Sequence, residues 1–277
     1  MDSAAAVLHQ HVSPRIFQIL LQHCHQLHCL LPNMGRGKKP SLLPPEEEAV
    51  VLANVAEQAE RYDDMVEYMK DRISAGKALC REEREMVAAA FKGAMSSRRL
   101  AVRVAKSIQD QEAEADKEKN AALAAGYLSK VRLELQGICI QVLELIEGTL
   151  LPKAENGEPK VFYKKMQADY YRYLAEFLQD SKEAVASASE VYADATAEAE
   201  THLMVTHPLR LGLALNHAVF QQVVQQDTAA AVRIAKDAHH VAVRALEGMP
   251  QEALRDANPL LMLLQENLRA WSPEDFP

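Results

Sequence analysis

The seven residues HCHQLHC, positions 23 to 29, form the densest group of metal-ligand side chains in the sequence. On a helix, Cys24 and His28 would lie one turn apart, as would His25 and Cys29, and either pair could form one edge of a zinc site. The two pairs face different ways, however, and four ligands on one short helix cannot close a tetrahedron, so a zinc site here would need a partner chain. The apolar side chains nearby share one helical stripe that includes Cys24, and they are Ile16, Leu20, Leu27 and Leu31. We therefore interpret the segment as an amphipathic or disordered leader without a metal, in which cysteine acts as a small apolar residue.

The sequence lacks the short motifs that carry common enzyme chemistry. It contains neither G-x-x-x-x-G-K-[ST] nor G-x-G-x-x-G, so it predicts no glycine-rich loop that cradles a phosphate. It contains no E-x-x-H, which excludes the usual carboxylate-bridged two-metal bundle, and no G-x-S-x-G nucleophile elbow. The sequence therefore predicts a protein that is not an enzyme and uses no cofactor.

Charge and cysteine usage limit the kinds of partner and compartment. The formal net charge is −8, and because residues 1–45 carry +3, the remainder carries −11. An acidic body argues against nucleic acid as the main partner. The cysteines at 24, 29, 80 and 139 show no disulfide spacing, which indicates a reducing compartment. The early apolar run IFQILLQHCHQLHCLL is too polar and too short to span a membrane, and it lacks the features of a signal peptide.

The sequence divides near residue 45 into an N-terminal extension and a region with helical patterning. The segment NMGRGKKPSLLPP is rich in Gly, Pro and basic residues, as linkers are, so residues 1–45 are interpreted as an N-terminal extension. From Glu46 the apolar residues recur at helical spacing, and no segment of useful length alternates like a strand. The pattern predicts an all-α domain over residues 46–271, followed by a short tail at 272–277.

Turn and capping residues predict where the helices begin and end. Two helices are expected over 46–76, the second stopped by Gly76, and two very long helices between 81 and Pro152, joined near EAEADKEKN. After a turn at NGEP (156–159), helices are expected to start near Pro159, near Ser181, after 207–208 and near Thr228, with a last helix running to Trp271.

Basic residues share one face of the first very long helix. Lys92 and Arg99 are seven residues apart, which is two helical turns, and Arg103 lies one further turn along. Such charges most often belong to a solvated face, so the spacing alone does not establish a site.

A later helix repeats this spacing with possible positioning groups beside it. Lys165 and Arg172 are seven residues apart, and Tyr173 follows directly. Asp169 and Glu176 lie three and four residues from Arg172, where they could hold its guanidinium group in one pose.

Two further helices each carry one asparagine on an apolar face. The stripes are Leu215, Asn216 and Val219 on one helix and Leu260, Leu263, Asn267 and Trp271 on the other. In a core, such an amide needs a hydrogen-bond partner; in a groove, it could clamp the backbone of an extended peptide. Spacing alone favours the core interpretation and leaves both open.

Several segments together resemble the signature sequences of the 14-3-3 family. They are AEQAERYDDM (56–65), VFYKKMQADYYRYLAEF (161–177) and THPLRLGLALN (206–216), and NLRAW (267–271) resembles the family's last helix. The similarity runs in order from about Glu46 to Trp271. It implies nine antiparallel helices in a cup-shaped protomer that dimerises. It also implies an amphipathic groove that binds phosphoserine or phosphothreonine in an extended segment of a client protein.

The resemblance assigns roles to individual residues. The phosphate-binding positions fall on Lys92, Arg99, Arg172 and Tyr173, the groove lysine on Lys165, the backbone-clamping asparagines on Asn216 and Asn267, and the apolar wall on Leu215, Val219, Leu260, Leu263 and Trp271. The implied dimer interface comprises Val55, Ala59, Arg61, Asp64, Val104, Ile108, Tyr127, Lys130 and Glu134, with Arg61–Glu134 and Asp64–Lys130 pairs across it. The implied partners are phosphorylated client proteins and a second copy or a paralogue, with no nucleic acid and no membrane. The implied compartment is the cytoplasm, with the nucleus as a second location.

The sequence departs from the family pattern at several positions. The extension over residues 1–45 is not part of the pattern. Val223 stands where the family has a groove glutamate, because the family's FYYE segment reads FQQV here. Ala101 stands where some members carry a phosphorylatable serine at the dimer interface, and Ala270 replaces a leucine of the apolar wall.

A helical-repeat scaffold that binds peptides without phosphate is the alternative function. The sequence shows no 34-residue period, which argues against a tetratricopeptide-type array. Comparing one peptide with and without phosphate separates the two functions.

Overall fold

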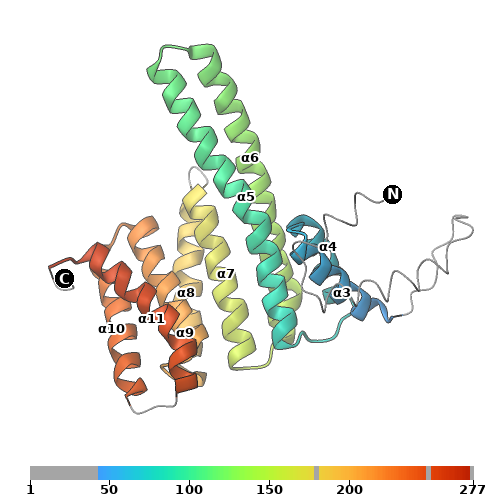
Figure 1. Ribbon diagram of the computed structural model, residues 1–277, viewed down its shortest axis with the longest axis vertical. Helices are drawn as coiled ribbons and strands as arrows, with labels where there is room; N and C mark the ends of the chain where they lie inside the picture. Colours follow the sequence, from blue (N-terminus) through green and yellow to red (C-terminus); the bar gives the residue numbers. More distant parts are fainter. Residues whose placement is uncertain (1–42, 178–180, 248–250, 275–277) are drawn as a thin grey trace, which may run out of the picture. The chain divides into compact units, whose positions relative to one another are not determined.

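The computed structural model describes residues 43–177, 181–247 and 251–274. These residues form nine α-helices and no strand, which confirms the all-α prediction (Figure 1). The helices are α3 (Pro45–Gln58), α4 (Tyr62–Ser74), α5 (Arg81–Glu114), α6 (Glu118–Leu145), α7 (Glu158–Phe177), α8 (Lys182–His202), α9 (Pro208–Phe220), α10 (Thr228–Leu246) and α11 (Gln251–Trp271). Residues 1–42, which include the histidine–cysteine cluster, lie outside the described residues.

Local sequence signals account for the first two helices. Pro45 occupies the first position of α3, where its missing N–H is not needed, and three glutamates follow in the first turn, where the helix dipole favours negative charge. The second helix, α4, ends at Ser74, and Gly76 has a φ of 87°. A left-handed φ is unstrained for glycine, so Gly76 stops α4 as predicted.

The long helices α5 and α6 lie side by side (Figure 1). They are joined at residues 115–117, within the predicted stretch EAEADKEKN, and Asp116 takes a φ of 55° at the corner. Their facing apolar side chains are fully buried and include Phe91, Leu135 and Cys139. These residues form the core on which one side of α7 also packs.

Helix α6 continues through a π turn, η1 (Ile146–Leu150), and a 3-10 turn, η2 (Leu151–Lys153). By length and composition, the stretch Glu118–Lys153 is apolar enough to cross a membrane, and 33% of its most apolar window is buried within the protein. Three of the exposed apolar residues on this stretch are Leu123, Tyr127 and Leu133.

Helices α7, α8 and α9 form a second core. Helix α7 begins directly after Gly157, whose φ is 95°, at the predicted NGEP turn. Helix α9 begins at Pro208, and the preceding His207 accepts a hydrogen bond from the Leu209 amide at its Nδ1. The largest fully buried side chains of this core are Tyr192 and Phe220.

Helices α9, α10 and α11 complete the domain through a third core. The Asp227 carboxylate accepts a hydrogen bond from the Ala230 amide and caps α10. Because α9 contacts both α7 and α11, it holds the predicted basic and apolar residues of the groove on one set of neighbouring helices.

Candidate functional site

Two arginines from different helices meet on one tyrosine ring. The guanidinium carbon of Arg99, on α5, lies 4.9 Å from the centroid of the Tyr173 ring, and that of Arg172, on α7, lies 4.4 Å from it. Arg99 also lies 5.4 Å from the centroid of the Phe177 ring. These cation–π contacts fix the planes of both guanidinium groups. We call Arg99, Arg172 and Tyr173 the arginine pair site.

Two side chains, those of Glu176 and Tyr192, hold the guanidinium group of Arg172 in place. Its Nη1 donates to Glu176 at 3.3 Å, and its Nε donates to the Tyr192 hydroxyl at 3.2 Å. The Glu176 contact confirms the predicted role of that carboxylate. Arg172 is largely buried, with only 7% of its surface exposed. Helix α8, which carries Tyr192, covers it.

Arg99 differs from Arg172 in having no acidic partner. No ion pair joins Arg99 to another described residue, and its Nε is buried without a hydrogen bond among them. Lys92, two turns before it on α5, is exposed and also forms no ion pair with the described residues. Lys92 and Arg99 are therefore available to an external anion.

Asp169 joins the arginine pair site to the next part of the groove. Its carboxylate accepts hydrogen bonds from Lys165 at 2.9 Å, from the Tyr192 hydroxyl at 2.6 Å, and from the Asn216 amide at 2.8 Å to each oxygen. Asp169 acts on Arg172 through the Tyr192 hydroxyl, which accepts from Arg172 and donates to Asp169.

Asp169 stays ionised although it is buried. Burial alone would raise the pKa of Asp169, but the charges of Lys165 and Arg172 and the hydrogen bonds it accepts outweigh burial and lower the pKa. One carboxylate therefore orders a lysine, an amide and, through Tyr192, an arginine.

The two asparagines have different surroundings. Asn216 directs its amide nitrogen to Asp169, which leaves its Oδ1 facing away as a hydrogen-bond acceptor. Such an oxygen can accept an N–H from an extended peptide. The hydrogen bonds to Asp169 supply the partner that the core interpretation requires, and the groove interpretation of Asn216 stays a prediction. Asn267 is also half-buried, and no hydrogen bond joins its side chain to the described residues.

The predicted apolar wall lies on α9 and α11. Leu215, Leu260 and Trp271 pack at the edge of the third core, whereas Leu263 is 46% exposed. A Cβ at Gly212 would lie 3.7 Å from the Lys165 Cε and 3.9 Å from a methyl of Leu260, so the basic and apolar parts of the site adjoin there. Val219 is half-buried on α9.

The sequence analysis missed Tyr192, Phe177 and Arg132. Tyr192 lies on α8, twenty residues after Arg172, and no spacing rule connects the two. Arg132, on α6, lines a cavity of about 600 Å³ together with Arg103, Glu176 and Phe177. Glu176 also contacts Arg172, and Phe177 also contacts Arg99. The cavity therefore lies beside the arginine pair site.

Val223 lies in a π turn, η3 (Gln221–Gln225), and is 52% exposed. In an uninterrupted α-helix, Val223 would share the face of Asn216, because the two residues are seven apart. A π turn bonds residue i to i+5 and changes that register. Whether Val223 overlooks the groove therefore stays a prediction.

The apolar residues implied at a dimer interface are exposed on the protomer. Val55 is 56% exposed, Val104 48%, Ile108 45% and Tyr127 55%, and Ala59 is exposed as well. Val104, Ile108 and Tyr127 line one hollow of about 610 Å³ on α5 and α6, which also includes Ala101, Leu100 and Leu123.

Three charged residues of the implied interface, Arg61, Asp64 and Glu134, have partners within the protomer. Arg61 pairs with Asp64, and Arg98 lies 2.7 Å from Asp63 and 3.7 Å from Glu134. Lys130 is exposed. Arg61–Glu134 and Asp64–Lys130 pairs across a dimer would therefore form at the expense of existing contacts.

The described residues contain no group of three or more His, Cys, Asp or Glu side chains that could hold a metal ion. Of the cysteines in this part of the chain, Cys139 is buried and Cys80 exposed, and both are free thiols. The possible zinc ligands between 23 and 29 lie outside the described residues.

The protein belongs to a class of all-helical adaptors that bind other proteins. The family model described as "14-3-3 protein" matches residues 52–272, and the chain belongs to the 14-3-3 family. The chain is 42% identical over 231 residues to "14-3-3 family protein artA" of Aspergillus flavus, covering 83% of this chain and 97% of that protein. It is 39% identical over 230 residues to "14-3-3 protein 3" of Entamoeba histolytica, and the match covers 82% of this chain and 96% of that protein. It is 41% identical over 234 residues to "14-3-3-like protein GF14 iota" of Arabidopsis thaliana, and the match covers 83% of this chain and 87% of that protein.

Proposed function

We propose that this protein binds phosphoserine or phosphothreonine in extended segments of client proteins. One observation carries the proposal: Arg99 and Arg172 converge on the Tyr173 ring, and Arg99 has no acidic partner among the described residues. Lys92 adds a further open cation on the same face of α5.

Phosphate is the ligand that suits this arrangement. A phosphate dianion offers three acceptor oxygens, and planar guanidinium groups bind it through paired hydrogen bonds. The Tyr173 hydroxyl adds a neutral donor. An unphosphorylated serine would leave the cations unpaired, so binding follows phosphorylation of the client.

The rest of the groove binds the peptide residues on either side of the phosphorylated residue. The free Oδ1 of Asn216 accepts a backbone N–H, and Asn267 is proposed to act in the same way. The exposed Leu263 and the edge of Trp271 receive apolar side chains of the client. These roles require no catalytic group, and the protein acts as a non-enzymatic adaptor in the cytoplasm and nucleus.

A pull-down with and without phosphatase tests the proposal. The tagged protein is incubated with one lysate, half of which has been treated with a serine/threonine phosphatase. We expect most retained proteins to disappear after phosphatase treatment. Equal recovery from both halves would favour the phosphate-independent scaffold.

We further propose a homodimer, with a heterodimer with a paralogue as a variant. Exposed apolar side chains gather in one hollow, as they do at interaction sites, and they are Leu100, Val104, Ile108, Leu123 and Tyr127. Two grooves in one dimer would give avidity for clients with two phosphorylated sites.

Replacing Ile108 with glutamate is expected to convert the dimer into a monomer. Burial of apolar surface supplies most of the association free energy, whereas rim ion pairs contribute only about 0 to 1 kcal/mol each. Light scattering at micromolar concentration measures the mass. Met204→Glu is the control, because Met204 is 67% exposed and lies on the α8–α9 connection, away from the hollow. A monomeric parent protein, or a dimeric Ile108→Glu variant, contradicts the proposed interface.

Deleting residues 1–45 is expected to leave folding and phosphopeptide binding unchanged. The three described cores use no residue before Ala53. The shortened chain, starting at Glu46, is compared with the full chain by circular dichroism and peptide titration. Insolubility, or binding at least tenfold weaker, would show that the extension belongs to the functional domain.

Restoring a glutamate at Val223 is expected to reduce the salt dependence of phosphopeptide binding and to sharpen the preference among flanking sequences. A carboxylate near the groove would partly balance Lys92, Arg99, Lys165 and Arg172, which lowers the Coulomb attraction that salt screens. It would also hold these cations in position before the ligand arrives. Titrating both proteins with two phosphopeptides at low and high salt measures both effects. Identical slopes and preferences would place Val223 outside the groove.

A further inference from the structure

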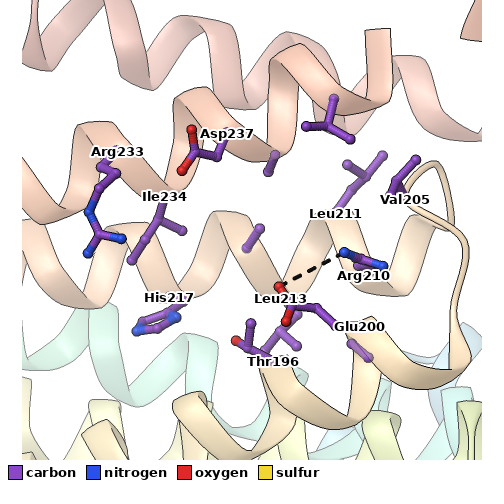
Figure 2. A pocket seen from close by; sticks show the side chains of 14 residues that line it. Thr196, Glu200, Val205, Arg210, Leu211, Leu213, His217, Arg233, Ile234 and Asp237 are labelled. Carbon is purple, nitrogen blue, oxygen red and sulfur yellow. Dashed lines mark ion pairs between the residues drawn. The ribbon is translucent and has the colours of Figure 1, made fainter. Parts of the chain in front are cut away.

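A cavity of about 370 Å³ lies between α8, α9 and α10 (Figure 2). Its volume falls within the range of small-molecule sites, about 300 to 1,000 Å³. The space exists because small side chains face it from all three helices, namely Ala199, Ala214 and Ala238. None of the residues assigned to the phosphopeptide groove lines this cavity.

The cavity has apolar walls and polar ends. Leu211, Ile234 and Val241 contribute to the walls. Figure 2 shows Arg210 and Glu200 toward one end and Arg233 with His217 toward the other. Arg210 is engaged, since it donates to the Leu203 carbonyl at 2.9 Å and lies 4.0 Å from Glu200.

The other end offers a hydrogen-bond donor and a free cation. Burial, with a smaller contribution from the charge of Arg233, lowers the pKa of His217 to about 4, so its ring is neutral at pH 7. Its Nε2 lies 3.3 Å from the Gln221 side-chain nitrogen, and the tautomer in which Nε2 accepts from that nitrogen carries the ring proton on Nδ1. Arg233 is exposed and forms no ion pair with the described residues, not even with Asp237 one turn later. An N–H donor beside an unpaired guanidinium suits a carboxylate.

The same histidine connects the cavity to the phosphate site. Its ring stacks on Tyr192 with centroids 5.1 Å apart and an angle of 2° between the planes. The Tyr192 hydroxyl bonds both Arg172 and Asp169. A ligand that shifts His217 therefore acts on the side chain that positions the groove cations.

We propose that this cavity is a second ligand site for a small apolar molecule with one carboxylate, and that a ligand bound there changes the affinity of the groove for phosphopeptide. The carboxylate lies at Arg233 and the Nδ1–H of His217, and the apolar body lies between Leu211 and Ile234. The change in phosphopeptide affinity rests on the proposed phosphopeptide function, whereas the existence of the second ligand site does not.

Calorimetric titration of the full chain with 2-naphthoate tests the site. Filling the cavity with Ala238→Leu is expected to weaken binding by about tenfold or more, while the melting temperature stays the same or rises. Arg233→Gln is expected to weaken binding about fivefold by removing the counter-charge, and Asp237→Asn is expected to strengthen it about twofold by removing a like charge. Arg244→Gln is the matched control, because Arg244 is an exposed residue of the same helix and does not line the cavity.

The neutral analogue 2-naphthamide and a groove variant separate the alternatives. The amide is expected to bind the parent protein more weakly than the acid and to be insensitive to Arg233→Gln. Lys92→Glu is expected to leave 2-naphthoate binding unchanged. Binding that survives Ala238→Leu and Arg233→Gln, or that is lost in Lys92→Glu, would place the acid in the groove and overturn the site.

Phosphopeptide titrations with and without saturating 2-naphthoate test the coupling. We expect the phosphopeptide affinity to change by about twofold or more in the parent protein, with a reciprocal change in naphthoate affinity, since linkage requires both. The effect should vanish in His217→Leu, which keeps bulk but loses the planar stack. An unchanged phosphopeptide affinity overturns the coupling. If phosphopeptide does not bind at all, the proposed function fails, and the naphthoate titrations still decide whether the second site exists.

Discussion

Replacing Arg99 with glutamate is expected to weaken phosphopeptide binding by about 30-fold to several-thousand-fold, because losing one partner of a desolvated charge pair typically costs about 2 to 5 kcal/mol. The new carboxylate would face the phosphate directly. The fold should survive, since Arg99 loses no ion pair with the described residues and gives up only its contacts with the Tyr173 and Phe177 rings. Titration of one phosphopeptide by calorimetry measures the loss, and circular dichroism checks the fold.

Two further variants make this result specific. Arg81→Glu reverses the same charge on the same helix, 18 residues earlier and therefore about 27 Å away along the axis. Arg81 is exposed and pairs with Glu85, so its reversal should leave binding within about twofold. Arg99→Lys keeps the charge but loses the planar fork, and we expect an intermediate loss. Equal affinities for Arg99→Glu and Arg81→Glu would refute the arginine pair site. Arg172→Glu is a poorer test, because Arg172 is buried and its reversal would also place a third carboxylate near Asp169 and Glu176.

Replacing Asp169 with asparagine is expected to lower the free energy of unfolding by about 3 kcal/mol, because removing one member of a buried ion pair leaves its partners uncompensated. Lys165, Arg172, the Tyr192 hydroxyl and the Asn216 amide all depend on this carboxylate. Asp194→Asn is the matched control. Asp194 pairs with Lys164 at 3.4 Å but its side chain is 68% exposed, so its loss should cost less than about 0.5 kcal/mol. Denaturant unfolding at one protein concentration compares the three proteins, and equal losses would contradict the buried role of Asp169.

The effect of Asp169 should depend on pH in one direction. Its pKa is lowered in the folded protein, so its contribution is fully present above the unfolded-state pKa of about 3.9 and is lost as the pH falls through the lower folded-state pKa. The difference in unfolding free energy between the parent protein and Asp169→Asn should therefore be constant near neutral pH and shrink below about pH 4. A difference that grows on acidification would mean that Asp169 is protonated in the folded state.

The sequence predicted the order and ends of the helices because local residues determine them. Gly76, the polar stretch near 115 and the NGEP turn each lie where a helix ends or begins, and the left-handed φ values of Gly76 and Gly157 suit glycine. Spacing on one helix also placed Lys92 with Arg99, and Lys165 with Arg172, because residues seven apart share a face whatever surrounds them.

The sequence could not predict which neighbour covers each face. Arg172 is buried because α8 brings Tyr192 over it, and that contact joins residues twenty positions apart on two different helices. The π turn at Gln221–Gln225 also has no simple residue signature, and it changes the direction in which Val223 points. For the same reason, the exposed residues of α5 and α6 indicate an interface but do not determine which partner covers them.

Titrating one serine peptide with and without its phosphate tests the central claim most directly. The peptide is taken from a client recovered in the pull-down, and both forms are measured by calorimetry against the full chain at physiological salt. We predict saturable binding of the phosphorylated form and at least 100-fold weaker binding of the unphosphorylated form, since Lys92 and Arg99 form no ion pair with the described residues. Equal affinity for the two forms would contradict the phosphate-binding role of Arg99 and Arg172 and would favour a groove that reads peptide shape alone.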